Sequence, residues 1–149
     1  MKLIVNKPQR FAKQRAHTAT HMLHYFLDAV LWWTKQAGSL VDNDYLRFDF
    51  AAKEPLTFEQ IQHIETLVNE WIINDQPVTI TEMSLEEAKK TWAKAFFEDK
   101  YWDVVRVVQI PHHSETTYVG NSTEFCGWTH VSSTWIIGAF KITNQEAVA

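Results

Sequence analysis

The sequence predicts an α+β fold, with helices packed on a mostly antiparallel sheet in a single domain. Helix-type and strand-type periodicities both occur along the chain. They mix without the strict strand–helix–strand alternation of a parallel α/β sheet. The 149 residues suffice for one hydrophobic core but not comfortably for two, and no repeat, low-complexity segment or linker divides them. We therefore expect one domain over residues 1–149.

Three segments carry the periodicity and the end signals of helices, at about 10–32, 57–74 and 84–95. In the first, apolar residues recur at helical spacings and a glycine lies a few residues beyond the end. The second and third each open on a capping box, in which Thr or Ser is followed three residues later by Gln or Glu.

Strands are predicted by alternation or by short β-branched runs. Residues 45–50 alternate, with Leu46, Phe48 and Phe50 on one face and charged residues on the other, as in a half-buried strand. Further strands are expected at 78–82, 104–110, 114–119 and 134–142.

The composition narrows the class of protein. Apolar residues make up 46% of the chain and charged residues 21%, as in ordinary globular proteins. No apolar run approaches the roughly 18 residues needed to cross a bilayer, and the N-terminus lacks a signal-peptide pattern. We expect a soluble, cytoplasmic protein with no membrane partner. Cys126 is the only cysteine and has no internal disulfide partner, so it is a buried thiol, a reactive thiol or a metal ligand.

The charge is unevenly distributed. The formal net charge of −4 argues against coating nucleic acid by charge alone. All the charges before Asp28, however, are basic: Lys2, Lys7, Arg10, Lys13 and Arg15. This patch is either a solvated helix face or a surface that contacts phosphates, with Arg10, Lys13 and Arg15 as the candidate contacts.

Two pairs of potential metal ligands share the same spacing. His17 and His21 lie four apart on a predicted helix, so both imidazoles project from one face. Cys126 and His130 repeat this spacing around Gly127, in what we expect to be a loop beside a strand. One thiolate with imidazoles is a set that zinc prefers, because zinc accepts mixed nitrogen and sulfur ligands tetrahedrally. We expect a zinc site between the first helix and this C-terminal loop.

Simpler explanations exist for each of these residues. The chain has seven histidines, so chance pairs occur, and Cys126 could be a small buried hydrophobe in a domain without metal. His24 shares the helical face of His21 and is either an outer partner of the metal site or a packing residue.

A family resemblance covers nearly the whole chain in unbroken order. The segments HTATHMLH, QAGSLV, YLRFDF, LVNEW, EMSLEEAKK, VVRVV and CGWTHVSSTWIIGAFKI resemble successive blocks of the editing domain of alanyl-tRNA synthetase. They are equally similar to the free-standing alanyl-tRNA editing proteins, and more distantly to the threonyl-tRNA synthetase editing domain. The chain could be a minimal editor or a fragment of a longer ligase.

The resemblance implies a function. In that family the HxxxH and CxxxH pairs bind Zn²⁺, which assigns the metal to His17, His21, Cys126 and His130. The family hydrolyses the ester bond of alanine tRNA mischarged with serine or glycine. We expect a polar pocket for the serine hydroxyl, formed by Gln36 and by Thr18 or Thr20, because a site built around a hydrogen bond discriminates against a substrate lacking it.

The mechanism stays open at two points. Four protein ligands fill a tetrahedron, whereas a catalytic zinc usually keeps one position for water. Either one candidate, such as His130, coordinates weakly, or the metal positions the substrate and another group activates water. A noncatalytic, zinc-stabilised tRNA-binding module is the alternative function.

The chain departs from the family pattern at tryptophans. Trp128 and Trp135 stand where the family typically has glycine, and Trp32, Trp92 and Trp102 fall at further glycine-type positions. The chain has 4 glycines and 7 tryptophans, so its glycine content is far below the usual ~7%. One hypothesis explains all five positions: the codon UGA is read as glycine in the source organism. If the tryptophans are genuine, Trp128 could obstruct the site.

Overall fold

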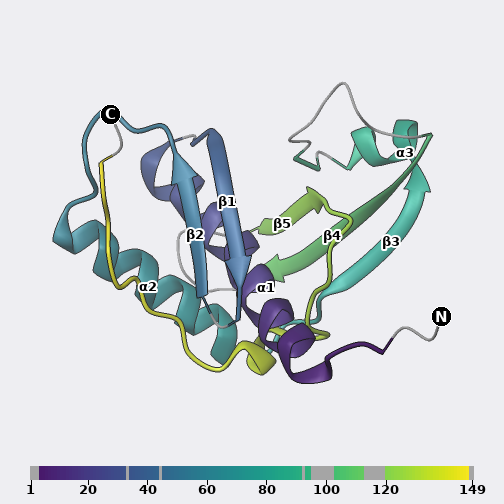
Figure 1. Cartoon of the computed structure of the whole chain (residues 1–149). Coiled ribbons are helices and arrows are strands. Elements are labelled where there is room, and N and C mark those ends of the chain that lie inside the picture. Colours follow the sequence, from purple (N-terminus) through teal and green to yellow (C-terminus); the bar gives the residue numbers. More distant parts are fainter. Residues whose placement is uncertain are drawn as a thin grey trace.

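The computed structural model describes residues 4–32, 34–43, 45–91, 93–94, 103–112 and 120–147. It confirms an α+β domain with two separate antiparallel sheets (Figure 1). The elements, in chain order, are α1 (Lys7–Leu31), β1 (Gln36–Asp42), β2 (Tyr45–Phe50), α2 (Phe58–Ile73), β3 (Thr79–Ser84), α3 (Leu85–Lys90), β4 (Val104–His112), β5 (Gly120–Phe125) and the short 3-10 helix η1 (Thr134–Ile137).

The long helix α1 lies at the centre of the molecule. The β1–β2 hairpin is on one side of it, and the sheet of β3, β4 and β5 is on the other (Figure 1). It contacts both strands of the hairpin, β5, η1 and α2. Side chains on its different faces can therefore meet the hairpin, the larger sheet and the C-terminal segment.

The main core fills the space between α1, α2 and the inner face of β4. Met22 and Phe26 of α1 pack with Trp71 of α2, and all three are fully buried. The Trp71 indole Nε1 donates to the backbone oxygen of Pro111 at 2.7 Å, so the core side chain also ties α2 to β4. Burying large apolar and aromatic side chains in this way is the main stabilising contribution to the fold.

The residues at the two ends of α1 differ in how well they suit a helix cap. Asn6 caps the N-terminus by accepting a hydrogen bond from the Gln9 N–H, and a proline lies in the first turn. At the C-terminus Trp32 adopts the left-handed conformation, with φ 55° and ψ 55°. That conformation usually belongs to glycine, because a Cβ atom is crowded there.

The structure confirms the predicted helices and corrects their details. The two capping boxes, Thr57 with Gln60 and Ser84 with Glu87, are both formed. The third helix ends at Lys90, earlier than expected, and residues 92 and 95–100 lie outside the described part. The strands at 45–50, 79–84 and 104–112 match the predicted ones closely.

The remaining strands differ from the predicted ones. The strand expected at 114–119 lies outside the described residues, and β5 begins just after it at Gly120. Neither β1 nor β5 was predicted. The strand expected at 134–142 is wrong, because this segment forms η1 and then an irregular stretch.

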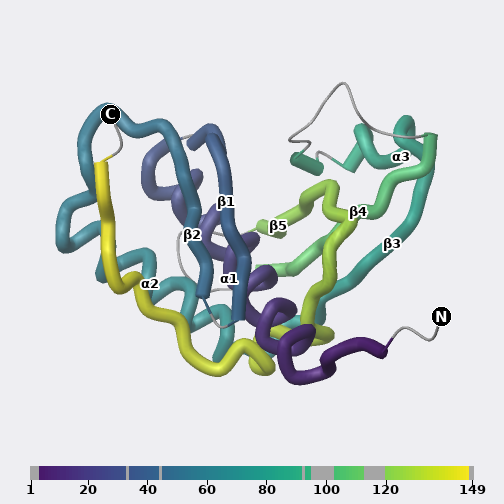
Figure 2. Tube along the Cα trace, in the orientation of Figure 1, coloured from purple at the N-terminus to yellow at the C-terminus, as the bar shows by residue number. Residues whose placement is uncertain are grey.

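The segment at 134–142 satisfies its backbone through α2 instead of through a sheet. Thr134 Oγ1 donates to the Trp71 carbonyl at the end of α2. Farther along, the Phe140 N–H donates to Asn69 Oδ1 at 3.0 Å, and the Ile142 N–H donates to Glu65 Oε1 at 2.6 Å. Figure 2 shows this segment in yellow alongside α2. Ile137 is buried in the main core, and Ile136, Phe140 and Ile142 pack against it, which explains the strand-like pattern in the sequence.

Among the described residues, no helix combines the length and apolarity that crossing a bilayer requires.

Candidate metal centre

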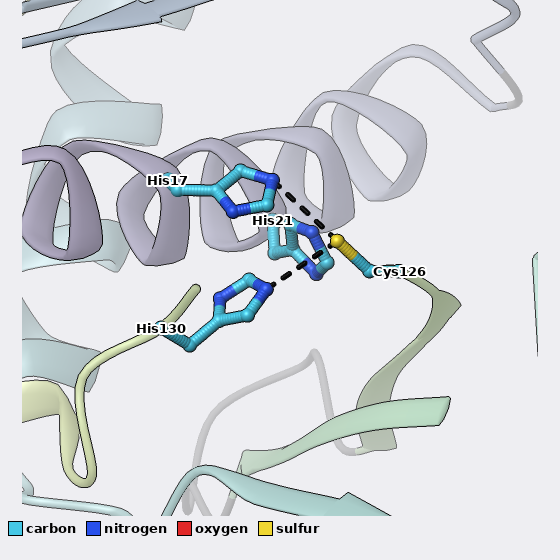
Figure 3. Close-up of side chains that lie close together, drawn as sticks. All are labelled: His17, His21, Cys126 and His130. Carbon is cyan, nitrogen blue, oxygen red and sulfur yellow. Dashed lines mark hydrogen bonds between the residues drawn. The ribbon is translucent and has the colours of Figure 1, made fainter. Parts of the chain in front are cut away.

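Helix α1 supplies the first half of the centre. His17 and His21 are one turn apart, and their rings lie 5.0 Å apart, edge to face. His21 is buried, whereas His17 is only partly covered. The predicted four-residue spacing therefore places both imidazoles on the helix face turned toward the end of β5 (Figure 3).

The loop after β5 supplies the second half. The Cys126 N–H donates to the Arg106 carbonyl at 2.9 Å, which fixes the loop's first residue against β4. The chain then turns, so that His130 returns to the same point from the other side (Figure 3). Cys126 Sγ lies 3.6 Å from His17 Nε2 and 3.5 Å from His130 Nε2.

The four side chains together have the geometry of a metal site. One ligand atom from each of His17, His21, Cys126 and His130 can be chosen so that all four lie within 4.8 Å of one another. Zinc bonds of about 2.0–2.3 Å in a tetrahedron imply ligand atoms roughly 3.3–3.8 Å apart. The two measured sulfur–nitrogen distances fall in that range, so the residues present fit a zinc ion with only small movements.

Hydrogen bonds set the orientation of two of the imidazoles. His17 Nδ1 donates to the Thr129 carbonyl oxygen at 3.2 Å. Thr18 Oγ1 donates to the Gln14 carbonyl and accepts from the Val131 N–H, so His130 Nδ1, 3.1 Å away, must act as a donor to it. Both rings therefore carry their proton on Nδ1 and present the unprotonated Nε2 to the centre, which is the form that binds metals.

Burial keeps these imidazoles neutral. It lowers the pKa of His17 and places the pKa of His21 well below the ordinary value. Burial, reinforced by His17 and Arg106, lowers the pKa of His130 to about 2. Burial also raises the pKa of the Cys126 thiol. Metal binding at this site would thus meet no competing protons on the imidazoles and would displace one from the thiol.

A cavity of about 940 Å³ opens beside the centre, between α1, the β1–β2 hairpin and the β4–β5 edge. His17, His21 and Cys126 contribute to its wall, whereas His130 does not line it. The candidate metal centre therefore faces a space large enough for a small substrate group.

The cavity contains some of the predicted pocket and patch residues. Thr20 and Gln36 line it, as do Arg10 and Lys13 near the start of α1. Thr18 is fully buried behind His130 and does not line it. Arg15 lies over the Phe11 ring at 4.8 Å and lines a separate cavity of about 430 Å³.

Two residues beside the site were not identified from the sequence. Arg106 lines the cavity and donates to the backbone oxygens of Cys126 and Trp128. Glu124 is a buried carboxylate two residues before Cys126. For Arg106 the available signal was a single arginine in an otherwise apolar strand run.

Comparison with known proteins points to one group of relatives. The family model of the threonyl and alanyl tRNA synthetase second additional domain matches residues 105–149. The chain is 49% identical over 148 residues to an alanine–tRNA ligase of Thermotoga petrophila. The aligned region covers 99% of this chain and 16% of that protein. It is 50% identical over 143 residues to the enzyme of Thermus thermophilus, covering 95% of this chain and 16% of that protein.

These matches define the class of protein first: residues 105–149 match the second additional domain of the threonyl- and alanyl-tRNA synthetases. More particularly, it is related along nearly its whole length to a segment of alanine–tRNA ligase. The chain spans about a sixth of the length of these relatives.

Proposed function

We propose that this chain is a zinc-dependent editing domain that hydrolyses alanine tRNA mischarged with serine or glycine. The observation that carries the proposal is the cluster of His17, His21, Cys126 and His130, of which the first three line a cavity of about 940 Å³. The similarity to alanine–tRNA ligases supports tRNA as the partner and an aminoacyl ester as the bond that is hydrolysed.

The charges around the cavity suit the end of a tRNA. Arg10 and Lys13 line the cavity at the beginning of α1, and Arg106 lines it from β4. Basic side chains at the entrance can neutralise the phosphates that precede the charged adenosine. The acidic net charge of the chain does not oppose this, because the described lining of the cavity contains three basic side chains and one carboxylate, that of Glu124.

Serine selectivity is assigned to Thr20 and Gln36. The Thr20 hydroxyl donates to the Ala16 carbonyl at 2.8 Å, which leaves its oxygen available as an acceptor for the substrate hydroxyl. Gln36 Nε2 donates to Ser39 Oγ at 3.1 Å, so the amide is held at the cavity wall. Alanine has no hydroxyl to satisfy these groups and is expected to be spared. This contact separates serine from alanine only, because glycine also lacks a hydroxyl.

The chemistry needs a polarised carbonyl and an activated water. Zinc, when bound, supplies Lewis acidity or lowers the pKa of a water molecule. His17, His21 and Cys126 would hold it from the cavity side, and His130 from behind. The proposal has two forms. In one His130 is a full ligand, and in the other it leaves a coordination position for water.

The direct test is hydrolysis by the zinc-loaded chain. We expect release of serine from Ser-tRNA(Ala), with Ala-tRNA(Ala) left intact. Cys126→Ala should lose both zinc content and hydrolysis. The matched control is His63→Ala, which removes an exposed histidine of α2 outside the centre and should retain both.

A noncatalytic tRNA-binding module is the second candidate. Trp128 favours it, because this side chain lines the cavity and is 74% exposed, where it can obstruct substrate entry. Serine release no faster than in buffer, with zinc present and the tRNA bound, would favour this second function over editing.

A further inference from the structure

A buried carboxylate lies directly behind the candidate metal centre. Glu124 of β5 is 4% exposed and points toward α1. Its Oε1 accepts a hydrogen bond from His24 Nδ1 at 3.0 Å, and its Oε2 lies 3.3 Å from His21 Nδ1. Ser122 Oγ is 3.5 Å from Oε1. One carboxylate therefore joins two histidines of the same helix face.

The His21 ring differs from the other two imidazoles of the centre. His17 and His130 have hydrogen bonds at Nδ1, as described above. His21 Nδ1 is within ion-pair distance of Glu124 but is not aligned for a hydrogen bond. It is one of two buried polar side-chain atoms that lack such a bond in the described part of the chain. A small rotation of the ring would complete the bond to Glu124.

A carboxylate at this depth requires compensating charge, because burying an unpaired ion is costly. Lys94 does not supply it by contact, since its ammonium pairs with Asp28. The donor set of one thiolate and three neutral imidazoles around a divalent ion carries one net positive charge. Glu124 can balance that charge at close range.

We propose that Glu124 is the positioning residue of the metal centre. It accepts a hydrogen bond from the Nδ1–H of His21, turns His21 Nε2 toward the ion and balances the charge of the loaded site. His24 Nδ1 donates to the other carboxylate oxygen of Glu124, and Asp28 Oδ1 lies 3.8 Å from His24 Nε2 on the opposite side of the ring. Such outer partners typically change metal affinity by about 10–100-fold. This inference rests on the proposed zinc centre.

The test measures zinc affinity by competition with a chromophoric chelator, independently of hydrolysis. Glu124→Gln keeps the shape of the side chain and removes its charge, and we expect its zinc Kd to rise by about 10–100-fold. The matched control is Glu65→Gln. Glu65 is also a buried glutamate, but it binds Lys141 and the Ile142 N–H, away from the centre. We expect Glu65→Gln to lower the melting temperature without changing the zinc Kd.

The outcomes separate this inference from the proposed function. If the unmodified chain binds no stoichiometric zinc, the metal centre itself fails. If it binds zinc and Glu124→Gln binds equally well, the positioning role alone is overturned. Should Glu124→Gln not fold, judged by far-UV circular dichroism, His24→Asn loosens the same carboxylate and should weaken zinc binding in the same direction. Unchanged affinity in a folded His24→Asn would also contradict the role.

A second inference comes from the tryptophans, independently of the metal centre. Trp32 ends α1 in the left-handed conformation and is 91% exposed. Trp128 and Trp135 are also strongly exposed, and Trp135 lies in η1. Trp71, by contrast, is fully buried and hydrogen-bonded. Three of the four described tryptophans thus lack the burial that normally accompanies so large a side chain.

We propose that positions 32, 128 and 135 are glycine in the natural polypeptide, because the source organism reads UGA as glycine. Glycine adopts the left-handed end of α1 without steric cost. At position 128 it would open the cavity beside Cys126. Trp71, which the core requires, should be a genuine tryptophan.

The gene and the native protein test this directly. We expect UGA codons at positions 32, 128 and 135 and a UGG codon at position 71, and native peptides with the mass of glycine at the three positions. UGG at the three exposed positions, or tryptophan masses there, would overturn the inference. In recombinant protein, Trp32→Gly should raise the melting temperature above that of Trp32→Ala, whereas Trp71→Gly should lower it strongly.

Discussion

At the scale of single residues, the neutrality of the imidazoles links metal binding to stability. His130 has its pKa lowered to about 2 by burial, and the pKa of His21 is also far below its usual value. A histidine with a lower pKa in the folded than in the unfolded chain binds fewer protons when folded. Its contribution is complete above the unfolded value of 6.5 and is lost as the pH falls from there toward the folded value.

We therefore expect the metal-free protein to lose stability between pH 7.5 and pH 5.5. Urea unfolding at the two pH values would measure the change in the free energy of unfolding. His130→Asn cannot gain a proton and should show a smaller loss over the same interval. An equal loss in the variant would mean that His130 does not contribute to this dependence.

Also at the residue scale, the sequence predicted the candidate ligands but not their surroundings. Identical four-residue spacings and a single cysteine identified His17, His21, Cys126 and His130, which the structure brings together. Glu124 could not be recognised, because its role depends on β5 lying against α1. Thr18 and Thr20 were indistinguishable in sequence, and their directions on the helix separate them into a buried position and a cavity wall.

At the scale of elements, α2 takes the place of a neighbouring strand for the C-terminal segment. Asn69 donates to the Phe140 carbonyl at 2.9 Å and accepts from the Phe140 N–H at 3.0 Å. An asparagine side chain can reproduce both halves of a backbone pairing in this way. The segment is therefore attached to a helix by side chains.

We expect Asn69→Ala to destabilise the protein by about 1–3 kcal/mol, because it leaves the Phe140 N–H and C=O without these partners. Urea unfolding would measure the effect. The control, Gln62→Ala, changes an exposed position of the same helix and should have little effect. A cost for Asn69→Ala no larger than for this control would show that the pairing is dispensable.

The sequence predicted an element correctly where the segment carried a complete local signal, such as a capping box or an alternating pattern. The capping boxes at Thr57 and Ser84 gave the starts of α2 and α3, and alternation gave β2. The segment at 134–142 was misassigned, because β-branched apolar residues suit any extended chain with one buried side. Its actual partner, α2, is about 70 residues earlier and leaves no local trace.

At the scale of the whole molecule, the basic beginning of α1 contributes Arg10 and Lys13 to the cavity wall. We expect Arg10→Ala to weaken binding of alanine tRNA and to reduce the salt dependence by about one unit in the slope of log K against log salt. Filter binding at several salt concentrations would measure both. Lys53→Ala removes an exposed charge that does not line the cavity, and should change neither. Equal salt slopes for the Arg10 variant and the unmodified chain would exclude a phosphate contact.

The two halves of the metal centre come from segments 109 residues apart, as the contact between His17 and Cys126 shows. An ion held by both halves would act as a cross-link that closes most of the chain into one loop. In the chain-entropy model, a permanent link around a loop of about 100 residues stabilises a fold by roughly 4.7 kcal/mol, chiefly by restricting the unfolded chain. An ion bound at this centre would then also stabilise the fold, and metal supply would govern how long the protein persists in its folded state.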